Sequence, residues 1–273
     1  MVLSLAVNNA IPKKSLGQHW LHDAASLASI CDSAEVQAGD TVLEVGPGLG
    51  TLTCQLLTRG ARVTAVEFDT TLAERLMANV TAAGVPTDNL TVVHEDILRF
   101  NLTTLPKGYK VVANIPYYLT SNLIRVMTES GNPFGTAAIL IQKEVAERVV
   151  AAPGQMSLLG VSAQFYCEVS LGALVPAELF TPPPKVDSQV LVLKYRPEPL
   201  FEGVDTKQFF RLVRAGFSQK RKTLVNSLSG GLSIPKDQAR ELLGAADILE
   251  NARAQALSLD DWYALYEVVR QRL

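Results

Sequence analysis

The alternation of short β-branched runs with helical repeats most restricts the fold that this chain can adopt. Five runs have the composition of strands, at residues 41–46, 62–69, 90–96, 110–115 and 136–142. Apolar residues at helical spacing fill the intervals between them, as at Leu72, Leu76 and Val80. Strands that alternate with helices usually pair in parallel, because each helix carries the chain back along the sheet. The pattern predicts an α/β fold with a mainly parallel sheet and helices on both faces.

The last third of the chain has a different pattern. Two further strand-like runs, at residues 168–175 and 188–195, are joined by a short linker that contains three prolines at 182–184. This linker is too short for a helical crossover, so we expect an antiparallel pair. After Pro197 and Pro199 only helical patterns remain. We therefore predict two domains, residues 1–197 and residues 198–273, of which the second is small and all-helical.

The composition excludes several classes of protein. Hydrophobic residues make up 48% of the chain and charged residues 19%, which is typical of a globular protein and too apolar for a disordered one. The apolar runs are much shorter than the roughly 20 residues needed to span a bilayer. Residues 1–11 lack the features of a signal or transit peptide. We expect a cytoplasmic protein with no membrane segment.

The cysteines and histidines do not indicate a metal site. The three cysteines and three histidines are widely separated and do not have the spacing of metal ligands. They are Cys31, Cys54 and Cys167, and His19, His22 and His94. We expect buried thiols and no bound metal.

The net charge of −2 hides an uneven distribution. Residues 1–180 carry 11 basic and 16 acidic groups, whereas residues 181–273 carry 14 and 11. Residues 206–236 contain no acidic group and seven basic ones, including Lys220, Arg221 and Lys222. Such a run can be an ordinary solvated helix face. It also favours a polyanionic partner, because phosphates would offset the repulsion between its charges.

A glycine-rich turn follows the first predicted strand. The segment 42–50 reads VLEVGPGLG, and its glycines Gly46, Gly48 and Gly50 allow a ligand to approach the backbone closely at the carboxyl edge of the sheet. The spacing GxGxG differs from the GxGxxG of nicotinamide-binding proteins. It argues against a dehydrogenase without excluding one.

Two acidic residues stand at the ends of the next strands. Glu67 ends the second strand, where a carboxylate can accept hydrogen bonds from both ribose hydroxyls of a nucleoside. Asp96 ends the third strand, where it can accept a hydrogen bond from an adenine amino group. Each alone could be a solvated acid at a strand end, but together they indicate a nucleoside cleft.

The most specific motif is Asn114-Ile115-Pro116-Tyr117, directly after the fourth strand. Proline restricts the backbone and removes a donor, which leaves neighbouring carbonyls available to a ligand. Asn114 provides a side-chain oxygen, the turn provides a main-chain oxygen, and Tyr117 provides a flat face. These groups match an adenine whose amino group carries two N–H donors.

Together these motifs resemble the ribosomal RNA adenine dimethyltransferase family, and within it the KsgA (RsmA) type that dimethylates two adjacent adenosines near the 3′ end of 16S rRNA. The resemblance covers nearly the whole chain. Residues 14–21 (KSLGQHWL) are similar to an opening that folds over the cofactor in relatives, although Leu16, His19 and Trp20 differ from its usual residues. Residues 175–188 and 217–224 (FSQKRKTL) are similar to two later signatures.

The resemblance implies a Rossmann-like class I methyltransferase domain with a mainly parallel seven-stranded sheet, and a helical RNA-binding domain. It implies S-adenosylmethionine as cofactor and a monomer acting on small-subunit rRNA in an immature 30S particle. The residues implied for the cofactor are Gln18, His19, Leu21, Gly46, Gly48, Glu67, Asp96, Ile97 and Asn114. Those implied for the target base are Asn114, Ile115, Pro116, Tyr117 and Phe180, with Phe180 stacking opposite Tyr117. Lys220, Arg221 and Lys222 would bind RNA.

Two other functions remain open from the sequence. The Erm type of enzyme, which methylates adenine in 23S rRNA, also carries an Asn-Ile-Pro-Tyr turn, although residues 182–188 and 217–224 favour the small-subunit type. A ribosome assembly factor that acts mainly by binding would use the same basic run.

Overall fold

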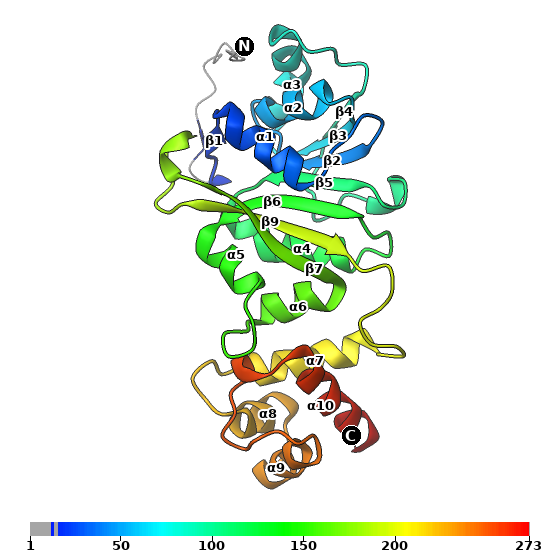
Figure 1. The fold of residues 1–273 in the computed structure, drawn as a ribbon, viewed down its shortest axis with the longest axis vertical. Helices are drawn as coiled ribbons and strands as arrows, with labels where there is room; N and C mark the ends of the chain where they lie inside the picture. Colours follow the sequence, from blue (N-terminus) through cyan, green and yellow to red (C-terminus); the bar gives the residue numbers. More distant parts are fainter. Residues whose placement is uncertain (1–11, 14–15, 273) are drawn as a thin grey trace. The chain divides into compact units, whose positions relative to one another are not determined.

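The strands predicted for the first half of the chain form one sheet. In this computed structural model, which describes residues 12–13 and 16–272, seven strands pair in the order β4-β3-β2-β5-β6-β9-β7. The strands of the sheet are β2 (Thr41–Val45), β3 (Arg62–Glu67), β4 (Leu90–His94), β5 (Lys110–Asn114), β6 (Thr136–Gln142), β7 (Cys167–Val175) and β9 (Ser188–Tyr195). Neighbours from β4 to β6 run parallel, whereas β9 runs antiparallel to β6 (Figure 1). The predicted fold class is confirmed.

Helices connect the parallel strands, as the apolar spacing predicts. They are α2 (Thr51–Thr58), α3 (Thr70–Ala82) and α4 (Thr120–Thr128), with the short 3-10 helices η2 (Leu102–Thr104) and η3 (Tyr117–Leu119). Helix α1 (Ala24–Ser33) precedes β2, and the 3-10 helix η4 (Ala177–Leu179) follows β7. In α3 the side chains of Leu72, Leu76 and Val80 are buried. Because β2, β3, β4 and β5 are parallel, their carboxyl ends all lie at one edge of the sheet.

A second, two-stranded sheet was not predicted from the sequence. It joins β1 (Trp20–Leu21) to β8 (Phe180–Thr181) in antiparallel register, with Leu21 opposite Phe180. The two strands are 2 residues each, too short for a periodic signal. They bring a segment from near the start of the chain against the residues that precede β9.

The chain divides into two compact units, which we call the sheet unit and the helical unit. The first contains the chain up to Ala146 together with Glu168–Tyr195, and the second contains Glu147–Cys167 and the chain from Arg196 onward. The last boundary, between Tyr195 and Arg196, is close to the predicted boundary at residue 197. The sequence pattern does not predict that residues 147–167 belong to the second unit, because it places them with the sheet.

Aromatic packing explains why Glu147–Cys167 belongs to the helical unit. The helices of this unit are α6 (Leu158–Tyr166), α7 (Thr206–Phe217), α8 (Leu224–Leu232), α9 (Lys236–Ala245), η5 (Ala254–Ala256) and α10 (Leu259–Arg272), and α5 (Lys143–Val149) crosses the boundary. The Phe165 ring of α6 lies 4.8 Å from Phe209 and 5.3 Å from Phe210, between ring centroids. Buried aromatic pairs of this kind stabilise a core beyond the area that they bury.

Among the described helices, none is long and apolar enough to cross a membrane.

Candidate functional site

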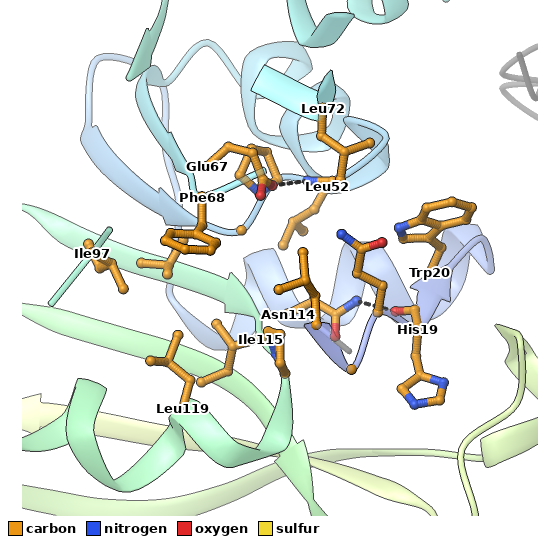
Figure 2. A pocket seen from close by; sticks show the side chains of 18 of the residues that line it. His19, Trp20, Leu52, Glu67, Phe68, Leu72, Ile97, Asn114, Ile115 and Leu119 are labelled. Carbon is orange, nitrogen blue, oxygen red and sulfur yellow. Dashed lines mark hydrogen bonds between the residues drawn. The ribbon is translucent and has the colours of Figure 1, made fainter. Parts of the chain in front are cut away.

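A cavity of about 300 Å³ lies where β2, β3 and β5 end, and Figure 2 shows side chains that line it. Every residue predicted to contact the cofactor or the target base lines this cavity. These residues are Gln18, His19, Leu21, Gly46, Gly48, Glu67, Asp96, Ile97, Asn114, Ile115, Pro116, Tyr117 and Phe180. The structure therefore brings together residues as far apart in the sequence as Gln18 and Phe180.

The glycine turn after β2 forms one wall. Gly46 and Gly48 have φ angles of +68° and +58°, a backbone conformation that other L residues rarely adopt. The Gly46 N–H donates to the Val66 carbonyl at 2.9 Å, which fixes the turn against β3. At these two positions the cavity is lined by main chain alone, because glycine has no side chain.

Glu67, the last residue of β3, is held in one orientation by two backbone donors. Its Oε2 accepts from the Gly48 N–H at 3.1 Å and its Oε1 accepts from the Asp69 N–H at 2.8 Å. Burial raises the pKa of this carboxyl, while the two N–H groups act in the opposite direction. Each carboxylate oxygen can accept more than one hydrogen bond, so both remain able to accept from a ligand.

Asp96, Ile97 and Phe68 form the neighbouring wall. Asp96 Oδ1 accepts from the Leu98 N–H at 3.0 Å, a local turn that holds the carboxylate in place. Phe68 is 61% exposed although it lies at the cavity, near Ile97 (Figure 2). Phe68 is not among the residues predicted from the sequence. Its position directly after Glu67 was the only signal that could have identified it.

Asn114 lies between the two sides of the cavity (Figure 2). Its Nδ2 donates to the His19 carbonyl at 3.5 Å, which leaves Oδ1 as an acceptor. In the turn that follows, the Pro116 carbonyl accepts from the Leu119 N–H at 3.0 Å and begins η3. Ile115, which is buried between Asn114 and Pro116 in the chain, also lines the cavity.

Tyr117 is held by a hydrogen bond to a residue of the antiparallel strand β9. Its hydroxyl lies 2.9 Å from Oγ of Ser188, a fully buried residue at the start of β9. Burial raises the pKa of the Tyr117 phenol, with the Ser188 hydrogen bond acting in the opposite direction. Tyr118, the next residue, also lines the cavity and is 66% exposed.

The N-terminal segment, described at residues 12–13 and 16–21, covers part of the cavity. His19 Nδ1 donates to the Pro182 carbonyl at 2.7 Å, so its ring extends away from Asn114 (Figure 2). A Cβ placed on Gly48 would lie 3.5 Å from the Trp20 indole, and Thr51 Oγ1 donates to the Leu21 carbonyl at 3.0 Å. Of the motif at 14–21, Lys14 and Ser15 lie outside the described residues.

The remaining predicted residues lie elsewhere. Lys220, Arg221 and Lys222 are exposed in the connection between α7 and α8 of the helical unit. The three cysteines are buried and free, as predicted. Among the described residues, no group of three or more His, Cys, Asp or Glu side chains could hold a metal ion.

Comparisons with known proteins agree with this site. The family described as "Ribosomal RNA adenine dimethylase" matches residues 9–271. "Ribosomal RNA small subunit methyltransferase A" of Dehalococcoides mccartyi (strain CBDB1) is 41% identical over 93% of this chain and 87% of the relative. The protein of the same name from Clostridioides difficile (strain 630) is 35% identical over 95% and 91%.

Solved structures show the same likeness. A dimethyladenosine transferase from Plasmodium falciparum is 26% identical, with a TM-score of 0.76 over 92% of this chain and 97% of that one. The 23S rRNA methyltransferase ErmE is 30% identical, with a TM-score of 0.71 over 92% and 100%. The family match extends over nearly the whole chain and confirms the resemblance seen in the sequence. The chain belongs to the ribosomal RNA adenine dimethylase family.

Proposed function

We propose that this protein transfers methyl groups from S-adenosylmethionine to the exocyclic amino groups of two adjacent adenosines near the 3′ end of 16S rRNA. It would act as a cytoplasmic monomer on an immature small subunit. The observation that carries the proposal is the turn Asn114–Tyr117 beside a cavity that also holds Glu67 and Asp96. The names of the relatives from D. mccartyi and C. difficile support the small subunit as substrate.

The cavity fits a nucleoside cofactor. Its volume of about 300 Å³ is at the lower end of the range of small-molecule sites. Glu67 would accept from the ribose hydroxyls, and Asp96 from the adenine amino group, with the apolar surfaces of Phe68 and Ile97 beside the adenine ring. When bound, S-adenosylmethionine supplies a methyl group on a positively charged sulfur.

The turn after β5 would hold the target base. The amino nitrogen of adenine is a poor nucleophile because its lone pair is delocalised into the ring. Asn114 Oδ1 and a main-chain carbonyl would accept the two amino hydrogens and favour a pyramidal nitrogen. The Pro116 carbonyl already accepts from Leu119, which favours the Ile115 carbonyl as the second acceptor. Catalysis would then come from positioning and electrostatic complementarity, without a general base.

Aromatic side chains would hold the plane of the base. Tyr117 and Phe180 both line the cavity and would stack on opposite faces of the adenine. Stacking contributes on the order of 1–3 kcal/mol per base in proteins that bind single strands. The adenosine must be unpaired or flipped out of a helix to reach the turn.

The helical unit would supply affinity for the RNA backbone. Lys220, Arg221 and Lys222 are exposed, and none of the ion pairs of the described residues includes them. Cations without a carboxylate partner can exchange their counter-ions for phosphates, which favours binding.

Methyl transfer to purified ribosomal subunits tests the proposal. Labelled S-adenosylmethionine should mark unmethylated small subunits, and mapping should place the label on two adjacent adenosines. Because the 23S rRNA methyltransferase ErmE is 30% identical over 92% of this chain, protein-free 23S rRNA is the second substrate to test. Label on 23S rRNA alone would overturn the choice of the small subunit.

A further inference from the structure

An ion pair joins the N-terminal segment to the end of β3. Lys13 Nζ lies 2.6 Å from Asp69 Oδ2, and the Lys13 N–H donates to Gln18 Oε1 at 2.8 Å. The Asp69 side chain is only 3% exposed, whereas that of Lys13 is 52% exposed. A buried carboxylate thus has its countercharge on a segment that lines the cavity.

Asp69 also makes two contacts that shape the cavity wall. Its Oδ1 accepts from the Thr71 N–H at 3.0 Å, which caps α3, and its own N–H donates to Glu67 Oε1 at 2.8 Å. Burial would raise the pKa of Asp69, but the hydrogen bond and charge of Lys13 lower it below its usual value. Lys13 therefore stabilises, as an anion, the residue whose backbone orients Glu67.

The other anchors of the N-terminal segment lie at its far end. They are the His19 ring's bond to the Pro182 carbonyl, the Asn114 bond to the His19 carbonyl, the contact of Trp20 with the Gly48 turn, and the Thr51 bond to the Leu21 carbonyl. Leu16, Gly17 and Gln18 line the cavity between these anchors and Lys13. The Lys13–Asp69 pair holds the end of the segment that the other contacts do not reach.

We propose that Lys13 is a positioning residue for the cofactor. Through Asp69 it holds residues 16–18 against the cavity and keeps Glu67 aimed at the ribose. Without Lys13 the Asp69 carboxylate would remain buried and unpaired, which is costly, so the loop that carries the Glu67 contact would shift. The proposal rests on the proposed binding of S-adenosylmethionine in this cavity.

Substitution of Lys13 tests this role through binding and turnover measured separately. Lys13→Met keeps the aliphatic stem and removes the charge. We expect the Kd for S-adenosylmethionine, measured by calorimetry, to rise about tenfold, the usual scale for a lost bond to a charged group. At saturating cofactor, kcat should change by less than about twofold, because the base site is intact. Lys13→Arg, which keeps the charge, should restore the Kd to within about threefold of wild type.

Lys194→Met is the matched control. Lys194 is 50% exposed and pairs with Glu35 at 2.7 Å in the same unit, and neither residue lines the cavity. This variant should bind the cofactor as the wild type does. Equal losses in Lys194→Met and Lys13→Met would show a general effect of charge and overturn the assignment.

Asp69→Asn provides the second arm. Asparagine caps helices about as well as aspartate, so the variant removes the ion pair and retains the cap on α3. We expect the Kd to rise, but by less than in Lys13→Met because asparagine leaves no unpaired buried charge. The double variant should lose no more than Lys13→Met, because both substitutions break one interaction. Additive losses would contradict the coupling.

The outcome that would overturn the inference is a Lys13→Met variant with wild-type Kd in a protein that methylates small subunits normally. Failure of the proposed function looks different, since the wild-type protein itself would then leave small subunits unmethylated.

Discussion

The sheet unit and the helical unit bury different kinds of side chain. Among the described residues, the buried carboxylates are Glu44, Glu67 and Asp69, and all three lie in the sheet unit. The helical unit instead buries a large apolar core, and Ser227 is its one buried polar residue among those described. Buried charges are expensive and need a reason. In this chain the buried carboxyl groups all lie in the sheet unit, with Glu67 on the cavity wall and Asp69 bonded to it, whereas the helical unit keeps its charges on the surface.

The three buried carboxylates are not equivalent. Glu67 and Asp69 have hydrogen-bond donors or a cation, but within the described part of the chain neither oxygen of Glu44 has a hydrogen-bond partner. Glu44 lies on β2, does not line the cavity, and is fully buried. Burial raises its pKa to about 8. Glu67 and Asp69 are therefore stabilised as anions by their partners, whereas Glu44 is favoured in its protonated form by burial.

The largest effect that we expect is on the rate of methyl transfer, without a matching loss of affinity for RNA. Asn114→Ala should lower kcat by about 100- to 1000-fold, the range seen when one preorganised hydrogen-bonding group is removed from a reacting centre. Affinity for RNA should change little. The measurement is single-turnover methylation of small subunits at saturating cofactor.

Asn132→Ala is the matched control for Asn114→Ala. Asn132 is also in the sheet unit, where its buried Nδ2 donates to the Leu102 and Leu105 carbonyls at 2.8 and 3.0 Å. Its loss should lower the free energy of unfolding and leave kcat of the folded protein unchanged. Full activity of Asn114→Ala would contradict the mechanism.

A pH series tests the buried carboxyl of Glu44. Its pKa is 4.5 in the unfolded chain and about 8 in the folded protein, so between these values only the folded state holds the proton. The contribution to stability is complete below pH 4.5 and is lost as the pH rises to about 8. Glu44→Gln should remove this loss, which we expect to be roughly 5 kcal/mol, since each pKa unit between the two states corresponds to about 1.4 kcal/mol. Urea unfolding of both proteins across this range measures it, and parallel pH curves would show that Glu44 does not titrate there.

Two glycines of the helical unit test its packing. In Gly216→Ala the new Cβ would lie 2.3 Å from Cη2 of the buried Trp262, so we expect a loss of about 1–3 kcal/mol in the free energy of unfolding. In Gly244→Ala the new Cβ would meet no atom within 4 Å. This control should be neutral or stabilising, because alanine favours helix. Urea unfolding followed by tryptophan fluorescence compares the two, and equal stabilities would show that the core around Trp262 is loose.

The smallest effect concerns the surface of the helical unit. Replacing Lys220, Arg221 and Lys222 together with alanine should weaken binding to small-subunit rRNA about tenfold and reduce the slope of log affinity against log salt by up to about 3. The Kd for S-adenosylmethionine should not change. Filter binding at several salt concentrations measures both the affinity for RNA and the slope of that affinity against salt.

The control for the triple variant uses cations that are already neutralised. Arg240 and Arg270 belong to the same unit and pair with Asp237 and Glu267 at 2.5 and 2.8 Å. Replacing both with alanine should leave the salt slope nearly unchanged. An equal change in both variants would mean that total charge, and not the run at 220–222, binds the RNA.

The sequence was most informative where the structural signal is local. Strand β5 and its turn were predicted because Lys110–Asn114 is a short apolar run that ends in Asn-Ile-Pro-Tyr. Local patterns did not identify Phe68, because its position directly after a strand is an ordinary one. Only its exposure at the cavity in the structure distinguishes it. Nor did local patterns place residues 147–167, because Phe209 and Phe210, which pack on Phe165, are 44 and 45 residues away in the sequence.

What the sequence determined by itself was the order of strands and helices, the turn chemistry at Gly46, Gly48 and Asn114, and the family. Backbone periodicity and turn residues act over a few positions, so the sequence states them directly. Only the tertiary structure decided that Trp20–Leu21 pairs with Phe180–Thr181, that His19 turns its ring to Pro182, and that Lys13 meets Asp69. These contacts depend on which surfaces meet after the sheet has formed, because no local pattern encodes a partner that is distant in the chain.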